Sequence, residues 1–153
     1  LQHKIDVIRA AIHLHRPDQA DPIDVLCKVG GFDIAAIAGV FLGGAACRLP
    51  VVVDGLISSV GALIAARLCP QCTSYMLASH ASQEPAARLT LEALGLEAPL
   101  HCRMALGEGT GAVALFPVLD LGLAVYEQMS SFSDIEMDPY TDFKKEEMLC
   151  SHS

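Results

Sequence analysis

The residues best suited to chemistry lie in the segment Gly107-Glu108-Gly109-Thr110-Gly111, where one carboxylate stands among three glycines. Glycine adopts positive φ and lets a ligand approach the backbone closely. Such a turn can direct the Glu108 carboxylate into a cleft, beside backbone N–H groups that are available to a ligand. A carboxylate held there could accept a proton from a bound substrate. The alternative is a solvated loop that ends with Thr110 as a helix N-cap.

Two apolar runs that are expected to be strands also end on polar residues. Residues 50–54 end in Asp54, and residues 74–79 are followed by His80. A nearly continuous apolar run is typical of a parallel strand that is buried on both faces. Ligands of open α/β sheets bind beyond the carboxyl ends of such strands. The sequence therefore predicts that Asp54, His80 and the Glu108 loop meet at one rim of a sheet.

Helices are expected to position this rim. Helical spacing of apolar residues predicts a helix from Lys4 to about His15 with one buried face. Residues 32–47 are apolar nearly all round, as in a helix buried against a sheet or another subunit. Further helices are expected over residues 22–28, capped by Asp21, and over 58–68, 84–94 and 112–129. The alternation of strands and helices predicts an α/β fold, a three-layer, Rossmann-like parallel sheet flanked by helices.

Composition excludes some classes of function. The chain has 153 residues, a net charge of −8 and 52% hydrophobic residues, and clustered Lys and Arg side chains for a nucleic acid are absent from it. Residues 34–68 are broken by Arg48, Pro50 and Asp54 into runs of about 15 residues, shorter than the roughly 20 that span a membrane. The chain opens without the pattern of a signal peptide. We therefore expect a cytoplasmic protein with no nucleic-acid partner and no membrane role.

The cysteines provide one further candidate site. Cys69 and Cys72 have C-x-x-C spacing, but zinc needs two more ligands at a suitable spacing. We expect this pair to be structural and the protein to need no metal or cofactor. Metal binding or redox chemistry is the alternative.

The chain resembles the C-terminal half of the nicotinate-nucleotide–dimethylbenzimidazole phosphoribosyltransferase family. Five blocks in the order of that family carry the resemblance, which spans roughly residues 4–132. They are residues 21–26, 29–39, 50–55, 79–82 and 106–112. The resemblance implies transfer of the phosphoribosyl group of nicotinate mononucleotide to 5,6-dimethylbenzimidazole, a step in assembling the nucleotide loop of cobalamin. It also implies a homodimer, or association with the N-terminal half.

The resemblance assigns Glu108 as the general base, and Lys4 to the substrate phosphate, with Leu106 as an apolar wall for the aromatic ring. The candidate substrate-binding residues are Lys4, Asp33, Asp54, His80, Leu106, Gly107, Gly109 and Thr110. Several of these have a structural alternative. In the structural alternative, Lys4 is a solvated lysine and Asp33 is a helix N-cap. Asp54 then stabilises the turn after its strand, and His80 is a hydrogen-bonded histidine of the rim without a role in binding.

The chain also departs from the family pattern. The N-terminal half is not present, Asp33 replaces a glutamate, Ala105 replaces an arginine, and Pro85-Ala86 replaces Gly-His. We expect residues 1–132 to be the C-terminal part of a phosphoribosyltransferase domain and residues 133–153 to be a charged, flexible tail. The departures leave a catalytically inactive fragment, which keeps the fold or ligand binding, as the alternative function.

Overall fold

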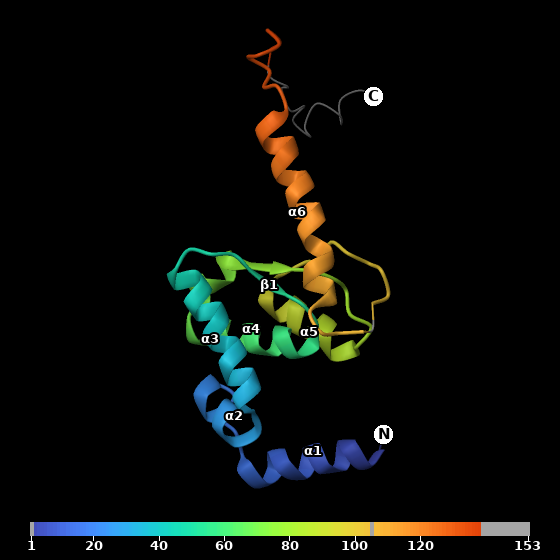
Figure 1. Ribbon diagram of the computed structural model, residues 1–153. Coiled ribbons are helices and arrows are strands. Elements are labelled where there is room, and N and C mark those ends of the chain that lie inside the picture. The colour runs from blue at the N-terminus through green and yellow to red at the C-terminus, as the bar shows by residue number, and fades with distance from the viewer. Residues whose placement is uncertain (1, 105, 139–153) are drawn as a thin grey trace, which may run out of the picture. The chain divides into compact units, whose positions relative to one another are not determined.

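The computed structural model describes residues 2–104 and 106–138, and the chain divides into two compact units, Leu1–Pro117 and Val118–Ser153 (Figure 1). The elements of the described residues are α1 (Gln2–His15), α2 (Pro22–Val29), α3 (Phe32–Ala46), β1 (Val51–Val53), α4 (Leu56–Leu68), the 3-10 helix η1 (Pro70–Tyr75), β2 (Met76–Ala78), α5 (Pro85–Leu94) and α6 (Thr110–Gln128).

The two strands form a small parallel sheet. Val51 lies opposite Met76 and Val53 opposite Ala78, and α4 with η1 connects the strands. The predicted parallel pair with a helix between its strands is therefore confirmed. The described residues contribute only these two strands to the sheet, so the three-layer arrangement stays a prediction.

The second strand is shorter than residues 74–79 predict. Residues 70–75 form η1 instead, which begins at Pro70. Proline fits the first position of a helix because its φ is already helical and its missing N–H would have no partner there. The Thr73 hydroxyl donates to the Pro70 carbonyl oxygen at 2.8 Å and stabilises the turn. Local hydrogen bonding thus outweighs the apolar pattern at this point.

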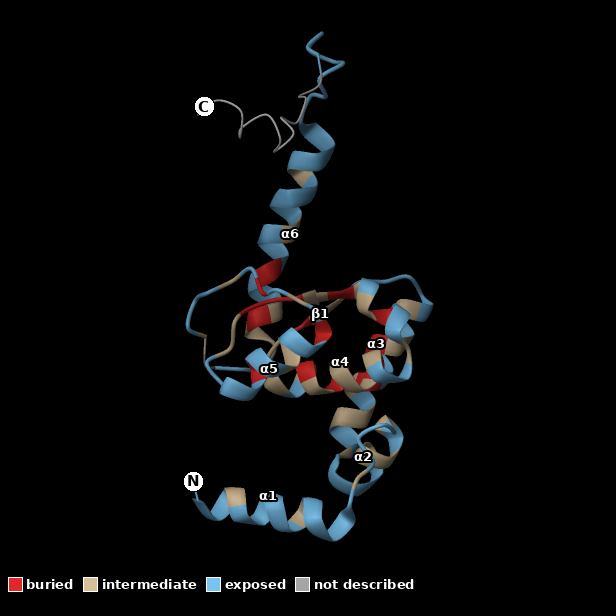
Figure 2. Cartoon of the chain, turned by 180° about the vertical axis from the view of Figure 1, so that it is seen from behind, coloured by how far each residue is buried: buried red, intermediate tan, exposed pale blue. Residues whose placement is uncertain are grey.

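The core lies where α3 and α4 pack together with the sheet. Buried residues concentrate on α4 and in the two strands (Figure 2). The buried cluster is Ala38, Phe41, Val53, Ala62, Ala65, Cys72, Met76 and Leu94. Most of these side chains are small, so close approach of the backbones provides the packing.

Gly61 marks one of these close approaches. A Cβ at this position would collide with the Ile37 side chain and lie 3.3 Å from the Ala38 backbone nitrogen. The contact between α3 and α4 therefore requires a residue without a side chain.

Two helices are less buried than the sequence predicts. On α1 none of the described residues is buried, and Ile8 and Ile12 are 58% and 51% exposed. On α3 only Ala38 and Phe41 are buried, while Phe32 is 97% exposed. The apolar spacing correctly predicts the helices, but burial of a face also requires a neighbouring element to cover it. Within this chain, the prediction of a buried face is wrong for α1. On α3 the described residues bury only Ala38 and Phe41, and burial of this helix against another subunit stays a prediction.

The predicted cap of α2 is confirmed. The Asp21 carboxylate accepts from the backbone N–H groups of Ile23 at 2.9 Å and Asp24 at 3.2 Å, and Pro22 is at the first helical position. An N-cap carboxylate satisfies amides that have no partner within the helix.

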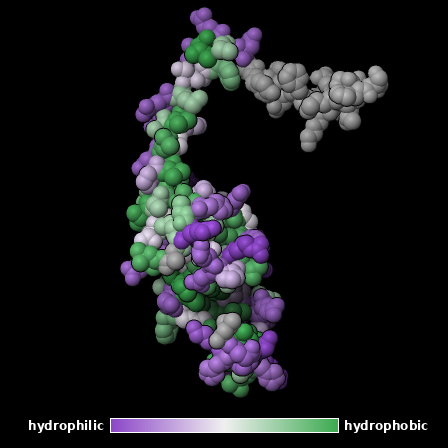
Figure 3. Space-filling view, turned by 90° about the vertical axis from the view of Figure 1, so that its right-hand side faces the viewer, coloured by the Kyte–Doolittle hydropathy of each residue, from purple (hydrophilic) through white to green (hydrophobic). Residues whose placement is uncertain are grey.

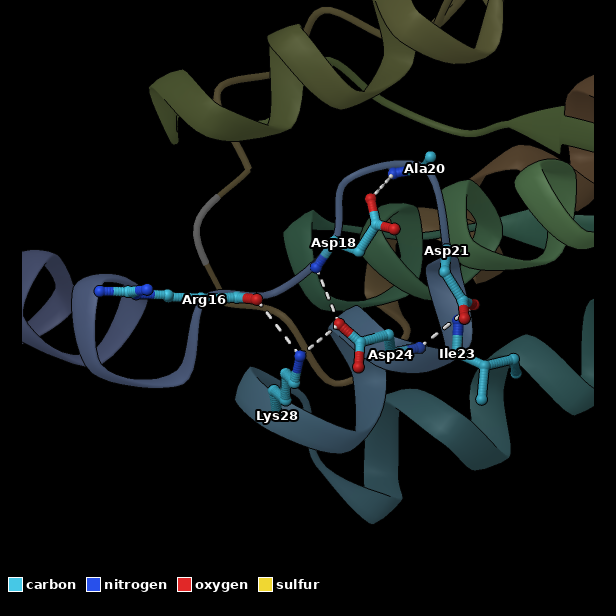
Figure 4. Close-up of polar contacts among 7 residues, drawn as sticks. All are labelled: Arg16, Asp18, Ala20, Asp21, Ile23, Asp24 and Lys28. Atoms are coloured by element: carbon cyan, nitrogen blue, oxygen red, sulfur yellow. Dashed lines mark hydrogen bonds and ion pairs between the residues drawn. The ribbon is translucent and has the colours of Figure 1, made fainter.

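The loop that precedes α2 is held by a second carboxylate (Figure 4). Asp24 Oδ2 accepts from the Asp18 backbone N–H at 2.8 Å and from Lys28 Nζ at 2.8 Å. Lys28 also donates to the Arg16 carbonyl oxygen at 3.2 Å. The backbone N–H of Asp18 and, secondly, the Lys28 ammonium hold the pKa of Asp24 below its usual value.

In the second unit, the part of α6 from Val118 to Gln128 is apolar and exposed. Hydrophobic side chains run along it (Figure 3), and Leu121, Val125 and Tyr126 are all exposed. Among the described residues, α6 is the helix that is long and apolar enough to cross a membrane by length and composition, with 11% of its 18-residue window buried. Apolar helices of other kinds of protein meet the same criterion. The predicted division at residues 132 and 133 stays a prediction, and residues 139–153 lie outside the described part.

We predict that Gly61→Ala lowers the free energy of unfolding by about 1–3 kcal/mol, because the added methyl overpacks the α3–α4 contact. Gly43→Ala is the matched control. Gly43 lies inside α3 with nothing within 4 Å of an added Cβ, so this change should be neutral or stabilising by up to about 1 kcal/mol. Urea denaturation of both variants measures the difference. Equal midpoints would contradict the packing argument.

We predict that Lys28→Ala raises the pKa of Asp24 but leaves it below its ordinary value, because the Asp18 amide is the larger cause of the shift. Since the folded-state pKa of Asp24 is lowered, its stabilising contribution is present above the unfolded pKa and is lost as pH falls through the folded pKa. Carboxyl-carbon NMR titration of both proteins measures the pKa. A fully normal pKa in the variant would assign the whole effect to Lys28.

Candidate functional site

The carboxylate of Asp54 holds the Glu108 loop and the start of α6. It follows β1 directly, so the rigid strand fixes its position. Its Oδ2 accepts from the Gly109 backbone N–H at 3.2 Å, and its Oδ1 accepts from the Ala112 backbone N–H at 2.9 Å. These amides lie at the N-terminal end of α6, where a negative charge also interacts favourably with the helix dipole. Asp54 therefore does not act only on the turn after its own strand: it also binds the loop and the helix that follow more than fifty residues later.

The loop itself has a strained geometry. Gly107, Glu108 and Gly109 have φ values of 76°, 57° and 79°. A left-handed conformation is easy for glycine but costs a residue with a side chain roughly 1–2 kcal/mol. Glu108 is therefore held in an unfavourable conformation by its surroundings, and such strain is frequent at functional sites.

Three hydrogen-bonding groups of this loop have partners within the chain. The Thr110 backbone N–H and its hydroxyl both donate to the Gly107 carbonyl oxygen, at 3.1 and 2.7 Å. The Gly109 amide is bound by Asp54. In this structure Gly109 and Thr110 shape the loop, and these groups are not free for a ligand. Glu108 is exposed at its apex.

His80 lies at the end of β2, next to the same helix. It is 6% exposed, and its Nδ1 is 3.0 Å from the Ser79 hydroxyl. A Cβ on Gly111 would collide with the His80 ring and lie 2.8 Å from Asp54 Oδ1. Only glycine at position 111 lets α6 begin this close to His80 and Asp54.

A cavity of about 220 Å³ opens between these groups. Asp54 and His80 line it together with Leu106 and Gly107. The structure therefore brings together the two strand ends and the glycine-rich loop, as the sequence predicts. The full set of lining residues is Asp54, Gly55, His80, Ser82, Gln83, Glu84, Met104, Leu106 and Gly107. Another cavity of about 230 Å³, between α5 and residues 96–101, is not lined by any predicted site residue.

Glu108, Gly109 and Thr110 belong to the loop beside the cavity but do not line it. Two further predicted site residues lie elsewhere in the fold. Lys4 is exposed on α1 and does not line the cavity, and neither does Asp33. Asp33 is exposed in the first turn of α3, whose N-cap is Gly31. The prediction of Asp33 as the N-cap is wrong, because the helix begins at Phe32 and Asp33 is already its second residue.

Ser79, Ser82 and Gly111 take part in the site although sequence reasoning gave them no role. The Ser79 hydroxyl donates to the Val53 carbonyl oxygen at 2.7 Å and so joins the ends of the two strands. The signal was present in the sequence, because serines flank His80 and Gly111 belongs to the glycine-rich segment.

The cysteine pair does not form a metal site in the described part of the chain. No group of three or more His, Cys, Asp or Glu residues that could hold a metal occurs among the described residues. Cys72 is 1% exposed, and burial raises the pKa of its thiol. A thiol with a raised pKa is a poor nucleophile at neutral pH, which favours the structural interpretation of Cys69 and Cys72.

Comparison with known proteins identifies the family. The model of a family described as "Phosphoribosyltransferase" matches residues 1–136. A nicotinate-nucleotide–dimethylbenzimidazole phosphoribosyltransferase from Acetivibrio thermocellus is 47% identical over 140 residues, which are 92% of this chain. The chain belongs to this family. The enzyme of that name from Escherichia coli K12 is also 47% identical, over 133 residues.

The family fold agrees with the structure. A crystal structure of the nicotinate-nucleotide–dimethylbenzimidazole phosphoribosyltransferase from Thermus thermophilus matches with a TM-score of 0.73 and 39% identity, over 78% of this chain. The match covers 36% of that chain, and the matches above cover 40% and 37% of the Acetivibrio and Escherichia enzymes. The chain thus spans about two-fifths of the length of these relatives.

We predict that Gly111→Ala lowers the free energy of unfolding by about 1–3 kcal/mol and shifts the NMR resonances of the His80 ring and the Gly107 and Gly109 amides. The added methyl would push the start of α6 away from His80 and Asp54.

Gly122→Ala is the control for this prediction. Gly122 lies within α6 with nothing within 4 Å of an added Cβ, so this variant should leave those resonances unchanged. If Gly111→Ala leaves them unchanged too, the close approach of α6 to His80 is wrong.

Proposed function

We propose that this chain carries the catalytic loop of a nicotinate-nucleotide–dimethylbenzimidazole phosphoribosyltransferase. The reaction transfers the phosphoribosyl group of nicotinate mononucleotide to 5,6-dimethylbenzimidazole, giving α-ribazole 5′-phosphate and nicotinate, in the assembly of the cobalamin nucleotide loop. The observation that carries this proposal is Glu108, held at positive φ on a loop that Asp54 ties to the end of β1. Family membership and the substrates named in the relatives' titles support it.

The chemistry requires one base. The bare ring nitrogen of the benzimidazole attacks C1′ of the ribose, and the bond from C1′ to the nicotinate nitrogen breaks. The bonding electrons stay on the nicotinate nitrogen, so the positively charged ring leaves as a neutral pyridine. The benzimidazole would become cationic unless its N–H proton is removed, and Glu108 accepts that proton. Alignment of the two rings supplies the remainder of the catalysis.

The other site residues take binding roles in this proposal. Leu106, which lines the cavity and is 76% exposed, offers an apolar surface to an aromatic ring. Lys4 provides an ammonium for the substrate phosphate, and Asp33 is a further polar contact. Gly107, Gly109 and Thr110 shape the loop that presents Glu108, and Asp54 and His80 form the rim.

The same proposal includes the setting of the chain. The two strands belong to a larger three-layer, Rossmann-like sheet, and the protein acts in the cytoplasm as a homodimer or with an N-terminal half. Exposed apolar residues on α1 and α3, such as Ile8 and Phe32, support association. Residues 1–132 form the enzyme domain and residues 133–153 the tail.

An inactive remnant is the second candidate function. Leu106 and Glu108 are both exposed, so the described residues do not enclose the reacting groups. A remnant would bind nicotinate mononucleotide or the benzimidazole without forming product.

We predict that Glu108→Gln lowers product formation by a factor of about 10² or more, the usual effect of losing a general base, while leaving the unfolding transition unchanged. Chromatography of α-ribazole 5′-phosphate formed from nicotinate mononucleotide and 5,6-dimethylbenzimidazole measures the rate. Glu127→Gln is the matched control, because Glu127 is an exposed glutamate of α6 outside the cavity. Full activity of Glu108→Gln would refute the assignment of the base.

The assay uses the chain alone and a chimera in which it replaces the matching 140 residues of the Acetivibrio enzyme. Activity of either one that depends on Glu108 supports the proposal. Activity of the chimera alone would mean that the remainder of the family fold completes the site. A folded chimera that binds nicotinate mononucleotide but forms no product would favour the inactive remnant.

A further inference from the structure

The hydrogen bonds around Ser79 fix the proton on the ring of His80. Ser79 Oγ lies 2.7 Å from the Val53 carbonyl oxygen and 3.2 Å from the Asp54 carbonyl oxygen. Carbonyl oxygens only accept, and a hydroxyl has a single proton to donate. The Ser79 proton is therefore used on these carbonyls. The 3.0 Å contact between Ser79 Oγ and His80 Nδ1 then requires His80 to donate from Nδ1.

The other ring nitrogen of His80 is consequently a hydrogen-bond acceptor. A neutral imidazole with a proton on Nδ1 has a lone pair on Nε2. Nε2 has no hydrogen-bond partner among the described residues, and within that part of the chain no buried side-chain nitrogen or oxygen lacks a partner. Nε2 is therefore not sealed from solvent. His80 lines the cavity next to Asp54, and Nε2 is the ring nitrogen that has no partner among the described residues.

The cavity around His80 favours a donor over an anion. Its described lining includes the carboxylates of Asp54 and Glu84 and contains no Lys or Arg. The N-terminal end of α6, which could otherwise attract a phosphate, already binds the Asp54 carboxylate. A phosphate would meet lone pairs and negative charge. A sugar hydroxyl would meet acceptors that match it.

We propose that His80, with its proton on Nδ1, accepts a hydrogen bond at Nε2 from a hydroxyl of the ribosyl group of the substrate. This assignment rests on the proposed function, which supplies a ribosyl substrate. It makes His80 a binding residue that Ser79 orients, and it separates the sugar subsite from the phosphate subsite.

The first test measures the tautomer without any ligand. The full chain, labelled with ¹⁵N-histidine, is examined by long-range ¹H–¹⁵N correlation at about pH 8, where histidine is ordinarily neutral. The His80 signals are assigned as those missing from His80→Asn. A protonated Nδ1 and a bare Nε2 are expected. The reverse tautomer, or protons on both nitrogens, would overturn the proposal.

The second test adds three probes: nicotinate mononucleotide, ribose 5-phosphate and inorganic phosphate. The Nε2 resonance should shift with the two ribosyl compounds and not with phosphate. A shift with phosphate alone would assign the site to the phosphate and overturn the proposal. If nicotinate mononucleotide shifts the Leu106 and Gly107 amides but not Nε2, the proposal fails and the proposed function survives. The same probes are added to the chimera with the Acetivibrio enzyme, and if no probe binds either protein, both the proposal and the proposed function fail.

Variants separate ligand binding from a merely structural role. In His80→Asn, the amide N–H can still donate to Ser79, but no group replaces Nε2. We predict that this variant unfolds at the same urea concentration and binds nicotinate mononucleotide about tenfold more weakly, the effect of one lost hydrogen bond. His101→Asn, an exposed histidine outside this cavity, should bind normally. Normal binding by a folded His80→Asn would show that His80 serves only the structure; if that variant does not fold, the tautomer and probe spectra of the unmodified chain still decide.

Discussion

The candidate site depends on the carboxylate of Asp54. Through this side chain the end of β1 binds a segment more than fifty residues further along the chain. One carboxylate oxygen accepts from the Gly109 amide and the other from the Ala112 amide. The strand provides a rigid base, and the amides of the first turn of α6 provide donors that the helix itself cannot satisfy. Because each carboxylate oxygen binds one of the two amides, Asp54 fixes both the start of the helix and the conformation of the loop before it.

This interaction also determines what the loop can do. A glycine-rich turn at the start of a helix is usually a site for anions, since its amides and the helix dipole attract negative charge. Here the protein supplies that negative charge itself, through Asp54, and Thr110 closes the turn onto Gly107. The amides of Gly109 and Ala112 are therefore already bound to a carboxylate, and the feature that distinguishes the loop is the exposed Glu108 at its apex. The loop is built to present a carboxylate.

The sequence predicts the local features of this chain and the meeting of the two strand ends with the Glu108 loop, but it does not reveal the individual long-range contacts that hold them together. The Asp21 cap, the helices and the parallel order of the two strands follow from rules that act over a few residues, and the structure confirms them. The partners of Asp54 and the contact between Ser79 and Val53 join residues 25 or more positions apart, so no spacing rule reveals them. Asp33 shows a different limit. The sequence offered Asp33 as a cap for α3, but the helix begins at Phe32 and Gly31 takes the N-cap position.

Burial is the property that the sequence predicts least well, and the reason is physical. Apolar spacing predicts that one face of a helix is covered, but it does not predict which element covers that face. The faces of α4 find partners in α3 and α5 within the described residues, and there the core is closed at Ala62 and Ala65. Ile8 on α1, Phe32 on α3 and Leu106 beside the cavity carry the same kind of signal and stay exposed. Removing these apolar side chains from water lowers the free energy. Each is therefore a position where contact with a further protein surface or an aromatic substrate would be favourable. Leu106 differs from the other two because it lines the cavity and lies two residues before Glu108 in the same loop.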